Sequence, residues 1–448
     1  MTSDIAAQAE SGFKRRWAHI VPIVFILYTI AYLDRVNVGM ALPSVSKDLA
    51  LSPTQAGFVG GIFFWGYVVS FLSAGWLANR FGAKRVILVA LFFWGMFAMG
   101  SGLAQTYHQL LAMRVMLGLS EGPIWSSVAA LLTQWFLKDE RARAFGCWNL
   151  SIPAGALLSG PISGLVLSYT NWHVMFALEG LPAWIGAVIW WRMIPPGPAS
   201  AAWLPASERT HLLAGLTRED ERFRALGPTD WHGMFRHPAL YFLLGANCFN
   251  NLVQYGFALW LPTAIKDASA FRIGSVGVLS AIPYIAAGIG IVAATLSSDR
   301  MRERRLHAAV PLISAGVLLY LASHAVSMGI AITMVLFTLS GFFLFMTLPL
   351  LNVIMTDVLP RTQAVAAISF TGGISNLFGG TVGPTLVGWL KAQTGDFSLA
   401  FSVLGGLGVL GGLLVLAIRV PRGAPVGSEA GAAVGRFKLL AERGGIDE

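Results

Sequence analysis

Charged residues are scarce in this sequence. Asp, Glu, Lys and Arg make up 12% of its 448 residues, whereas hydrophobic residues make up 55% and the mean hydropathy is +0.66. A soluble globular domain carries about twice that charged fraction, so the composition excludes one. It predicts an all-α membrane protein that crosses the bilayer many times.

Cysteine is nearly absent, and ligand clusters are missing. Cys147 and Cys248 fall in separate halves of the chain, so we interpret them as packing residues and expect no disulfide. The eight histidines show no metal-ligand spacing, and the glycine-rich runs lack the strand and lysine of a phosphate loop. We therefore expect no metal, no cofactor and no enzyme, because no nucleophile with a base is apparent.

Apolar runs long enough to cross a bilayer recur along the chain. A crossing needs roughly 20 helical residues. Twelve such spans are predicted: 17–43, 54–78, 83–104, 106–136, 141–168, 172–193, 237–265, 273–298, 305–326, 328–356, 362–390 and 396–420. The first span follows Lys14, Arg15 and Arg16, but it is too long for a signal peptide and lacks a small-residue cleavage pattern.

Basic residues alternate between loops in a way that predicts the orientation. If both termini are cytoplasmic, 25 of the 31 Lys and Arg lie inside, as the positive-inside rule requires. The net charge of +9 is then explained by a surface that faces anionic lipid headgroups. We expect no nucleic-acid partner and a location in the cell membrane, which is the inner membrane in a Gram-negative bacterium.

A polar stretch separates two sets of six spans. We predict a cytoplasmic N-terminal segment (1–16), an N-terminal six-helix bundle (17–193), a cytoplasmic linker (194–236), a C-terminal six-helix bundle (237–420) and a cytoplasmic tail (421–448). Within the linker, residues 205–224 are rich in Glu, Arg and Leu and predict a surface helix. Transporters built from two such halves bind substrate between them, near the bilayer midplane.

Four ionisable residues lie deep inside otherwise apolar spans, and they are the strongest functional signal. Asp34 and Arg35 occur in the first span, and Arg114 and Glu121 in the fourth. A charge at the bilayer centre costs roughly 2.5–3.5 kcal/mol on insertion scales, so such residues pair, reach water and serve a function. Arg114 and Glu121 are seven residues apart and share a helix face, and Arg35 shares a face with Tyr32.

Sequence motifs add a family resemblance that covers the whole chain. The loop Gly75-Trp76-Leu77-Ala78-Asn79-Arg80-Phe81-Gly82 resembles the loop signature of the major facilitator superfamily. Within it, Tyr32-Leu33-Asp34-Arg35 and the stretch from Arg114 to Glu121-Gly122 resemble the anion:cation symporters. That family includes permeases for sugar acids, tartrate, phthalate and other aromatic acids. The resemblance implies twelve transmembrane helices in two six-helix halves.

The loop signature predicts a conformational latch with one departure from the family. Gly75, Asn79, Arg80 and Gly82 form it in the first half, and Asp299-Arg300 is its counterpart in the second. The family's usual aspartate is Asn79 here, which cannot form a salt bridge. We hypothesise that latching depends more on the Asp299-Arg300 pair.

The buried charges suggest a mechanism of proton coupling. Burial raises the pKa of a carboxyl group and a nearby guanidinium lowers it, so a carboxyl between the two exchanges a proton when its surroundings change. We hypothesise that Asp34 and Glu121 take up protons and thereby free Arg35 to bind a substrate carboxylate. The alternative is that the four charges form static ion pairs that only fix helix packing.

Neutral polar residues predict where specificity lies. Asn250 and Gln254 lie on roughly one stripe of the seventh span with Asn247 and Asn251, and Asn376 lies in the eleventh. Gln254 and Asn376 match positions where the resembled family places substrate-facing polar groups. Each could instead bond a neighbouring helix.

Single residues elsewhere leave further interpretations open. Tyr67 in the second span is either a ligand contact or a packed aromatic. Glu179 in the sixth span is interpreted as structural. Residues 155–164 resemble an antiporter signature, but their small residues equally suit close helix packing.

Taken together, these features predict a monomeric, proton-coupled importer of a small organic carboxylate such as a sugar acid, hydroxy acid or aromatic acid. An exchanger or efflux antiporter of small organic anions or drugs is the alternative. A membrane enzyme and a transporter-like sensor are the other classes, and the sensor would need a further soluble domain.

Overall fold

The computed structural model describes residues 2–225, 231–301 and 303–418, and these are helical with no strand among them. The first half contains α1 (Thr2–Asp48), α2 (Pro53–Gly61), α3 (Phe63–Phe81), α4 (Ala83–Ser101), α5 (Tyr107–Trp135), α6 (Lys138–Asn149), α7 (Ser151–Tyr169) and α8 (Trp172–Met193). The second half contains α10 (Pro238–Asp267), α11 (Ile273–Met301), α12 (Arg305–His324), η3 (Ala325–Met328), α13 (Ile330–Val358), α14 (Arg361–Thr394) and α15 (Ser398–Ala417). Between them lie η1 (Pro198–Ser200), α9 (Ala206–Ala225) and η2 (Gly233–Arg236).

The helices form twelve spans in two groups of six, which confirms the predicted fold class. Ten spans in the described residues are long and apolar enough to cross a membrane. The other two, α10 and α14, are as long but carry more amide, hydroxyl and glycine residues. Two spans predicted as single helices are interrupted, at Ile62 between α2 and α3 and at Leu150 between α6 and α7.

Local sequence signals explain where several spans begin. Ser52 and Gln55 form a capping box before α2, with Pro53 at its first turn. The side chains of Thr106 and Asn171 accept backbone N–H bonds at the starts of α5 and α8. These three caps precede spans that start on the side away from the linker.

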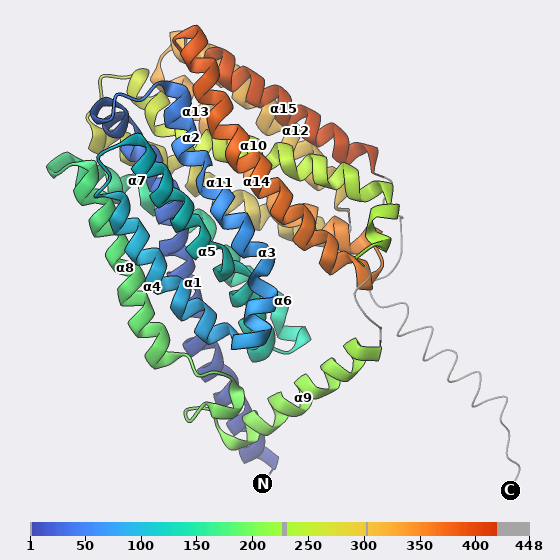
Figure 1. The fold of residues 1–448 in the computed structure, drawn as a ribbon. Coiled ribbons are helices and arrows are strands. Elements are labelled where there is room, and N and C mark those ends of the chain that lie inside the picture. The colour runs from blue at the N-terminus through green and yellow to red at the C-terminus, as the bar shows by residue number, and fades with distance from the viewer. Residues whose placement is uncertain (1, 226–230, 302, 419–448) are drawn as a thin grey trace, which may run out of the picture.

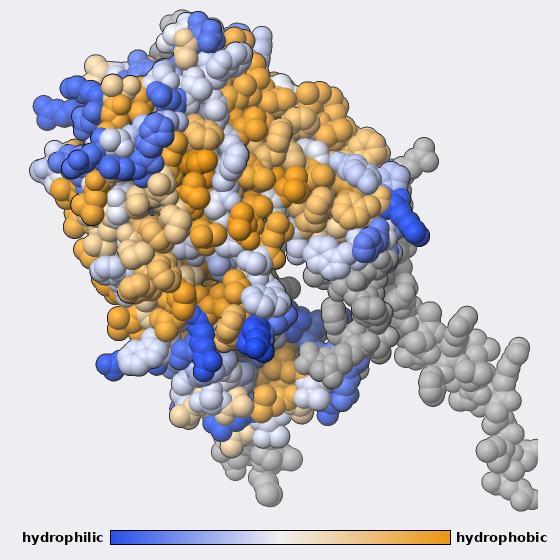
Figure 2. Space-filling model, in the orientation of Figure 1, coloured by the Kyte–Doolittle hydropathy of each residue, from blue (hydrophilic) through white to orange (hydrophobic). Residues whose placement is uncertain are grey.

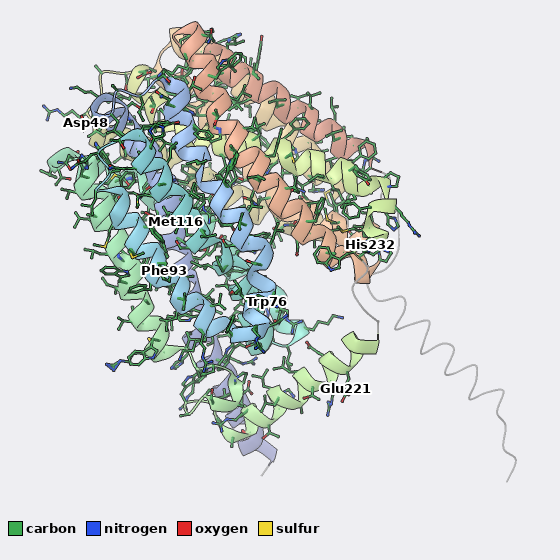
Figure 3. The ribbon with its side chains drawn as sticks, in the orientation of Figure 1. Asp48, Trp76, Phe93, Met116, Glu221 and His232 are labelled. Carbon is green, nitrogen blue, oxygen red and sulfur yellow. The ribbon has the colours of Figure 1, made fainter. Side chains whose placement is uncertain are left out.

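Large apolar side chains cover the outer surface of both bundles (Figure 2). Val69, Leu165 and Ile289 are each at least 60% exposed on three different spans. Figure 3 shows Asp48 near one end of the first bundle and Glu221 on α9 near the other, with Phe93 and Met116 between them. An apolar belt between polar ends is the surface of a multi-pass membrane protein.

The linker helix α9 is attached to the first half by ion pairs. Arg16, which is 2% exposed, contacts Glu140 at 2.7 Å and Glu208 of α9 at 2.9 Å. Arg141 of α6 contacts Glu219 of α9 at 2.9 Å. α9 occupies the stretch from which the surface helix is predicted, and it lies at the same end as the N-terminus (Figure 1).

The two halves meet at the end away from α9 and diverge toward it (Figure 1). At the meeting end, a methyl group added to Gly57 or Gly61 would overlap the backbone carbonyls of Pro384 or Thr381 on α14. Gly160 of α7 packs in the same way against Gly277 of α11. Figure 2 shows the surface hollowed between the halves on the α9 side. The conformation is therefore open toward the linker and closed at the opposite end.

Candidate functional site

The four predicted membrane charges lie in the interior of the molecule, on α1 and α5. Asp34 and Arg35 are 1% and 8% exposed, and Arg114 and Glu121 are 1% and 2% exposed. Glycines bring the surrounding helices together: Gly118 of α5 faces the backbone of Phe63 on α3, and Gly66 of α3 faces α5 in return. Larger residues would push α3 and its aromatic side chains away from the charges.

Arg35 forms a buried ion pair with Glu121. Its Nη2 donates to Glu121 Oε2 at 3.0 Å. The other carboxylate oxygen, Oε1, is buried without a hydrogen-bond partner in the described residues. Glu121 of α5 therefore pairs with an arginine of α1, and this ion pair joins the two helices.

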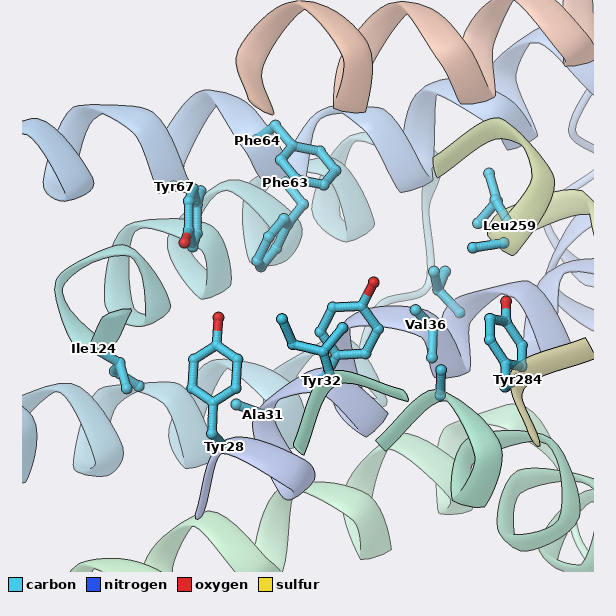
Figure 4. Packing of buried hydrophobic residues seen from close by; sticks show 14 of the residues in the cluster. Tyr28, Ala31, Tyr32, Val36, Phe63, Phe64, Tyr67, Ile124, Leu259 and Tyr284 are labelled. Carbon is cyan, nitrogen blue, oxygen red and sulfur yellow. The ribbon is translucent and has the colours of Figure 1, made fainter. Parts of the chain in front are cut away.

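Three aromatic rings surround the Arg35 guanidinium. Its central carbon lies 4.8 Å from the ring centre of Tyr67, 5.3 Å from that of Phe63 and 5.7 Å from that of Tyr32. Figure 4 shows these rings with Tyr28, whose hydroxyl points into the same space as that of Tyr67. The ring faces attract the cation and exclude lipid, and they leave its N–H groups for oxygen acceptors.

Asp34 accepts hydrogen bonds from neutral side chains, and no arginine of the described part of the chain donates to it. Its carboxylate oxygens accept from Trp94 Nε1 at 2.8 Å and from Asn37 Nδ2 at 3.0 Å. Asn37 also donates to Glu179 Oε2 at 2.6 Å, and Ser163 donates to Glu179 Oε1 at 2.7 Å. Asp34 and Arg35 are adjacent in sequence but bond different residues. This agrees with the angle of about 100° between successive side chains on a helix.

Arg114 is buried without an ion-pair partner among the described residues. Its guanidinium carbon lies 5.4 Å from the Phe63 ring centre, on the same ring that contacts Arg35. Its Nε has no hydrogen-bond partner in the described residues, and the charges of Asp34 and Glu121 act on it. A buried guanidinium with free donors can donate two parallel hydrogen bonds to an incoming carboxylate.

The second half contributes neutral polar groups. Asn250 and Gln254 are 1% and 5% exposed, and the Asn250 carbonyl oxygen has no partner in the described residues. Tyr255 donates its hydroxyl to Asn376 Oδ1 at 2.8 Å, so Asn376 belongs to a bonded pair between α10 and α14. Asn251 pairs with Ser375 in the same way at 3.1 Å.

A small cavity lies where the halves meet beside Arg35. Its volume is about 20 Å³, and Phe63 and Phe64 of α3, Tyr255 and Leu259 of α10 also line it. Phe64 and Tyr255 contact across the halves, with ring centres 4.4 Å apart. This space is enough for one water but not for an organic acid.

The predicted latch residues lie at the surface on the open side. Asn79, Arg80 and Gly82 are exposed, and Arg80 makes no ion pair with a described residue. Gly82 has φ +84°, which explains the glycine at the turn between α3 and α4. A methyl group added to Gly75 would meet no other atom within 4 Å. Arg300 is exposed, and the side chain of Asp299 lies outside the described residues.

Sequence reasoning missed several members of the site. Tyr28 and Asn37 lie on α1 one turn from Tyr32 and Asp34, so helical spacing could have found them. Phe63 and Trp94 come from two other helices, and no local pattern marks them. Glu179 was noted in the sixth span but interpreted as structural, and its link to Asp34 through Asn37 was not predicted. The described residues also bring together no group of three His, Cys, Asp or Glu side chains that could hold a metal.

Comparison with known proteins identifies the family of this site and fold. The family model of the Major Facilitator Superfamily matches residues 24–380 and, in a second alignment, residues 274–443. The chain belongs to the Major Facilitator Superfamily. It is therefore a multi-pass membrane transporter and not an enzyme.

Relatives and solved structures refine this placement. The hexuronate transporter of Bacillus subtilis is 29% identical over 429 residues, covering 93% of this chain and 98% of the relative. The quinolone resistance transporter of Acinetobacter baumannii is 28% identical over 389 residues, covering 85% and 88%. The crystal structure of a D-xylose-proton symporter superposes with a TM-score of 0.70 at 17% identity, covering 90% of this chain and 98% of the other. This last likeness shows the fold.

Proposed function

We propose that this transporter imports an organic carboxylate together with protons by alternating access. The observation that carries the proposal is the buried Arg35–Glu121 ion pair, which lies where the halves meet and beside the cavity. In this arrangement one guanidinium can bind either its own carboxylate or that of a substrate. Competition between the two couples the anion to the proton.

The coupling follows from charge and from hydrogen-bond geometry. When Glu121 is ionised, it occupies an N–H group of Arg35 at 3.0 Å. Protonation removes the charge of Glu121, so Arg35 is left buried without a counter-ion, which is costly. A substrate carboxylate then restores the pairing with two charge-assisted hydrogen bonds. Anion binding and proton binding therefore favour each other.

The positions of the remaining site residues suggest a role for each of them. Asp34 is proposed as a second proton-coupling acid because neutral donors alone hold it. Arg114 offers a second contact to the anion, and Tyr32 and Tyr67 orient Arg35. The amides of Asn250, Gln254 and Asn376 on the opposite half suit the hydroxyl or carbonyl groups of the cargo.

Alternating access requires that the two ends open in turn. The conformation here is closed by glycine contacts away from α9 and open on the α9 side. The alternation of basic loops supports placing the α9 side and both termini in the cytoplasm. We propose that the protein works as a monomer, and that the loop of Gly75, Asn79, Arg80 and Gly82 engages the second half when the cytoplasmic side closes.

The substrate class is proposed from chemistry and from one relative. A guanidinium in an aromatic cage opposite neutral amides fits a carboxylate that carries hydroxyl groups. The hexuronate transporter of Bacillus subtilis supports sugar acids as the first compounds to test.

Uptake by proteoliposomes tests the proposal. The purified protein is reconstituted, and accumulation of D-glucuronate, D-galacturonate, tartrate and phthalate is measured with the outside acidic. We expect at least one acid to be concentrated, and about tenfold per unit of pH gradient for each coupled proton. Equal uptake with and without the gradient, across the panel, would contradict proton coupling.

Efflux is the second candidate function, because the quinolone resistance transporter of Acinetobacter baumannii is also a relative. The same vesicles distinguish the two. Efflux by proton exchange would concentrate the compound on the acidic side of the membrane, whereas proton symport concentrates it on the alkaline side.

A further inference from the structure

Glu179 of α8 lies in the same buried network as Asp34, although the mechanism above gives it no role. Asn37 donates from its single amide nitrogen to Asp34 Oδ1 at 3.0 Å and to Glu179 Oε2 at 2.6 Å. Asn37 is 0% exposed and Glu179 is 6% exposed. Two carboxyl groups from different helices therefore meet at one neutral amide.

Within the described residues, no Lys, Arg or His side chain forms an ion pair or a hydrogen bond with either carboxyl group. The four oxygens each accept one neutral donor, from Asn37 twice, from Trp94 and from Ser163. Two ionised carboxylates buried in this way would repel each other and would lack the counter-charge that buried ions need. The arrangement is stable when at least one of the two carries a proton.

Asn37 offers a hydrogen-bond acceptor for the proton of a protonated carboxyl group. Its carbonyl oxygen Oδ1 is buried and has no hydrogen-bond partner in the described residues. In the present orientation Nδ2 donates to both carboxyl groups, and a half-turn of the amide puts Oδ1 in its place, where the oxygen can accept from whichever carboxyl is protonated. The amide can therefore serve the pair with the proton on either acid.

We propose that Glu179 is a third acid of the coupling centre and holds one proton jointly with Asp34 through Asn37. The proposal rests on the proton-coupled function above and deepens it. Three acids then face two arginines, Arg35 and Arg114. With one shared proton and Glu121 ionised, the resting centre is neutral, and one further proton balances one incoming carboxylate.

The charged groups around the pair are few. Asp34 on α1 is the charge that acts on Glu179, and the charges of Arg35 and Arg114 act on Asp34. Asp34 also interacts electrostatically with Glu121 of α5. Trp94 of α4 and Ser163 of α7, which face the pair from the other two helices, do not titrate in the working range. Replacing either Asp34 or Glu179 should therefore change the pH at which the other acid titrates.

Infrared titration of the purified protein tests the pair without substrate or transport. The C=O stretch of protonated carboxyl groups is followed against pH in wild type, Glu179→Gln, Asp34→Asn and the double variant. We expect each single substitution to shift the remaining acid's titration by about one pH unit or more, a tenfold change in H⁺ concentration. Independent titrations, with the single effects adding up to the double variant, would overturn the proposal.

Two controls separate a shared proton from a structural role. Glu208→Gln removes an equally buried carboxyl, 6% exposed, that pairs with Arg16 outside the centre, and it should leave the shared band unchanged. Gln at position 179 can accept from Asn37 through its Oε1 and donate from its Nε2 to the Ser163 hydroxyl, so a purely structural Glu179 predicts a wild-type titration for the Asp34 carboxyl. If Glu179→Gln does not fold, Asp34→Asn tests the same coupling from the other side.

Transport then distinguishes this proposal from the proposed function. In wild type, loss of the shared proton at alkaline pH adds a negative charge that repels the anion, so glucuronate exchange at equal pH should fall there. In a Glu121→Gln background, Glu179→Gln should extend exchange toward alkaline pH by at least one unit. If uptake by wild-type vesicles does not depend on the pH gradient, the proton-coupled function is wrong. If Glu179→Gln does not extend exchange toward alkaline pH and the two acids titrate independently, only the proposed role of Glu179 is wrong.

Discussion

The two halves of this transporter bury different kinds of polar group. Within the described residues, every buried charged side chain belongs to the first half or to the linker helix, including Asp34, Arg35, Arg114, Glu121 and Glu179. The second half buries amides and hydroxyls, among them Asn250, Asn251, Gln254 and Ser375. The cavity beside Arg35 lies where these two surfaces meet.

The difference suggests a division of labour. Buried ion pairs respond strongly to protonation, because removing one charge leaves its partner uncompensated. Neutral amides do not titrate, and each contributes a modest hydrogen bond. Variants in the first half should therefore change energy coupling, and variants in the second half should change which anion is preferred.

Replacing Arg35 should have the largest effect. Lysine keeps the charge but loses the planar pair of donors and the fit to three aromatic rings. Because hydrogen bonds to charged groups contribute about 1.5–3 kcal/mol, Arg35→Lys should lower glucuronate uptake about 10- to 100-fold in proteoliposomes. Arg192→Lys, an exposed arginine beside Trp191, is the matched control and should transport normally. Full uptake by Arg35→Lys would refute an anion-binding role.

Replacing Glu121 should separate binding from coupling. Glu121→Gln cannot ionise, so Arg35 stays available and exchange of labelled for unlabelled substrate should continue. Accumulation driven by one unit of pH gradient should fall about tenfold, the contribution of the proton that Glu121 carries. Asp267→Asn, a surface acid of the second half paired with Lys391, should keep full accumulation. Undiminished accumulation by Glu121→Gln would assign the coupling elsewhere.

Replacing Asn376 tests the second half. Asn376→Ala removes the acceptor of the Tyr255 hydroxyl, and loss of one neutral hydrogen bond corresponds to about a 2- to 12-fold rise in KM. The pH profile should not move, and the ranking of acids in a competition assay should change. Asn247→Ala is the control, because the Asn247 side chain bonds the backbone of its own helix. A shift in the pH profile of transport by Asn376→Ala would contradict the proposed division between a coupling half and a specificity half.

Restoring an acid at position 79 should have a small effect. An exposed ion pair contributes about 0.2–1 kcal/mol, so Asn79→Asp should raise the population closed on the α9 side by a factor of about 1.4 to 5. The distance distribution between spin labels at the α9-side ends of α3 and α14 measures this population. Asn171→Asp, which keeps the cap of α8 at the opposite end, should leave it unchanged. Identical distributions for wild type and Asn79→Asp would contradict latching by this loop.

A surface carboxylate of the second half should affect stability alone. Partial burial would raise the pKa of Glu303, but hydrogen bonds from the N–H groups of Leu306 and His307 and from the His307 ring outweigh it and lower this pKa. The stabilisation is therefore present above the ordinary value of about 4.3 and is lost as pH falls through the lowered pKa.

Glu303→Gln should destabilise the protein by about 1 kcal/mol at neutral pH, the usual contribution of a helix cap. Thermal unfolding at pH 7 and at about pH 3 measures the difference, which should vanish in acid as the wild-type carboxyl is protonated. Transport per folded molecule should not change. A difference that persists in acid would assign the effect to packing.

Much of the fold and half of the site could be predicted from the sequence. The twelve spans follow from apolar length, and Asp34, Arg35, Arg114 and Glu121 stand out because charges are rare in such spans. The breaks at Ile62 and Leu150 were not predicted, because Ile62 lies inside a continuous apolar run and Leu150 lies inside a segment long enough to be one span. The pairing of Arg35 with Glu121 could not be predicted from the sequence either, because two acids and two arginines allow several pairings.

The role of Glu179 shows the limit most clearly. Its partners Asn37 and Ser163 come from two other helices, and Asn37 lies 142 residues away in the chain. A local pattern around Glu179 therefore supports only a structural interpretation.

By itself, the sequence determined that this chain crosses a membrane twelve times in two halves and carries its rare charges in the first. Those properties depend on the composition of single segments about 20 residues long, which can be read without knowledge of their neighbours. The tertiary structure alone decided that Arg35 pairs with Glu121, that Asp34 has only neutral donors, and that Glu179 joins it. Contacts of this kind depend on how helices far apart in the chain rotate and approach one another, and glycines packed against backbone set that approach.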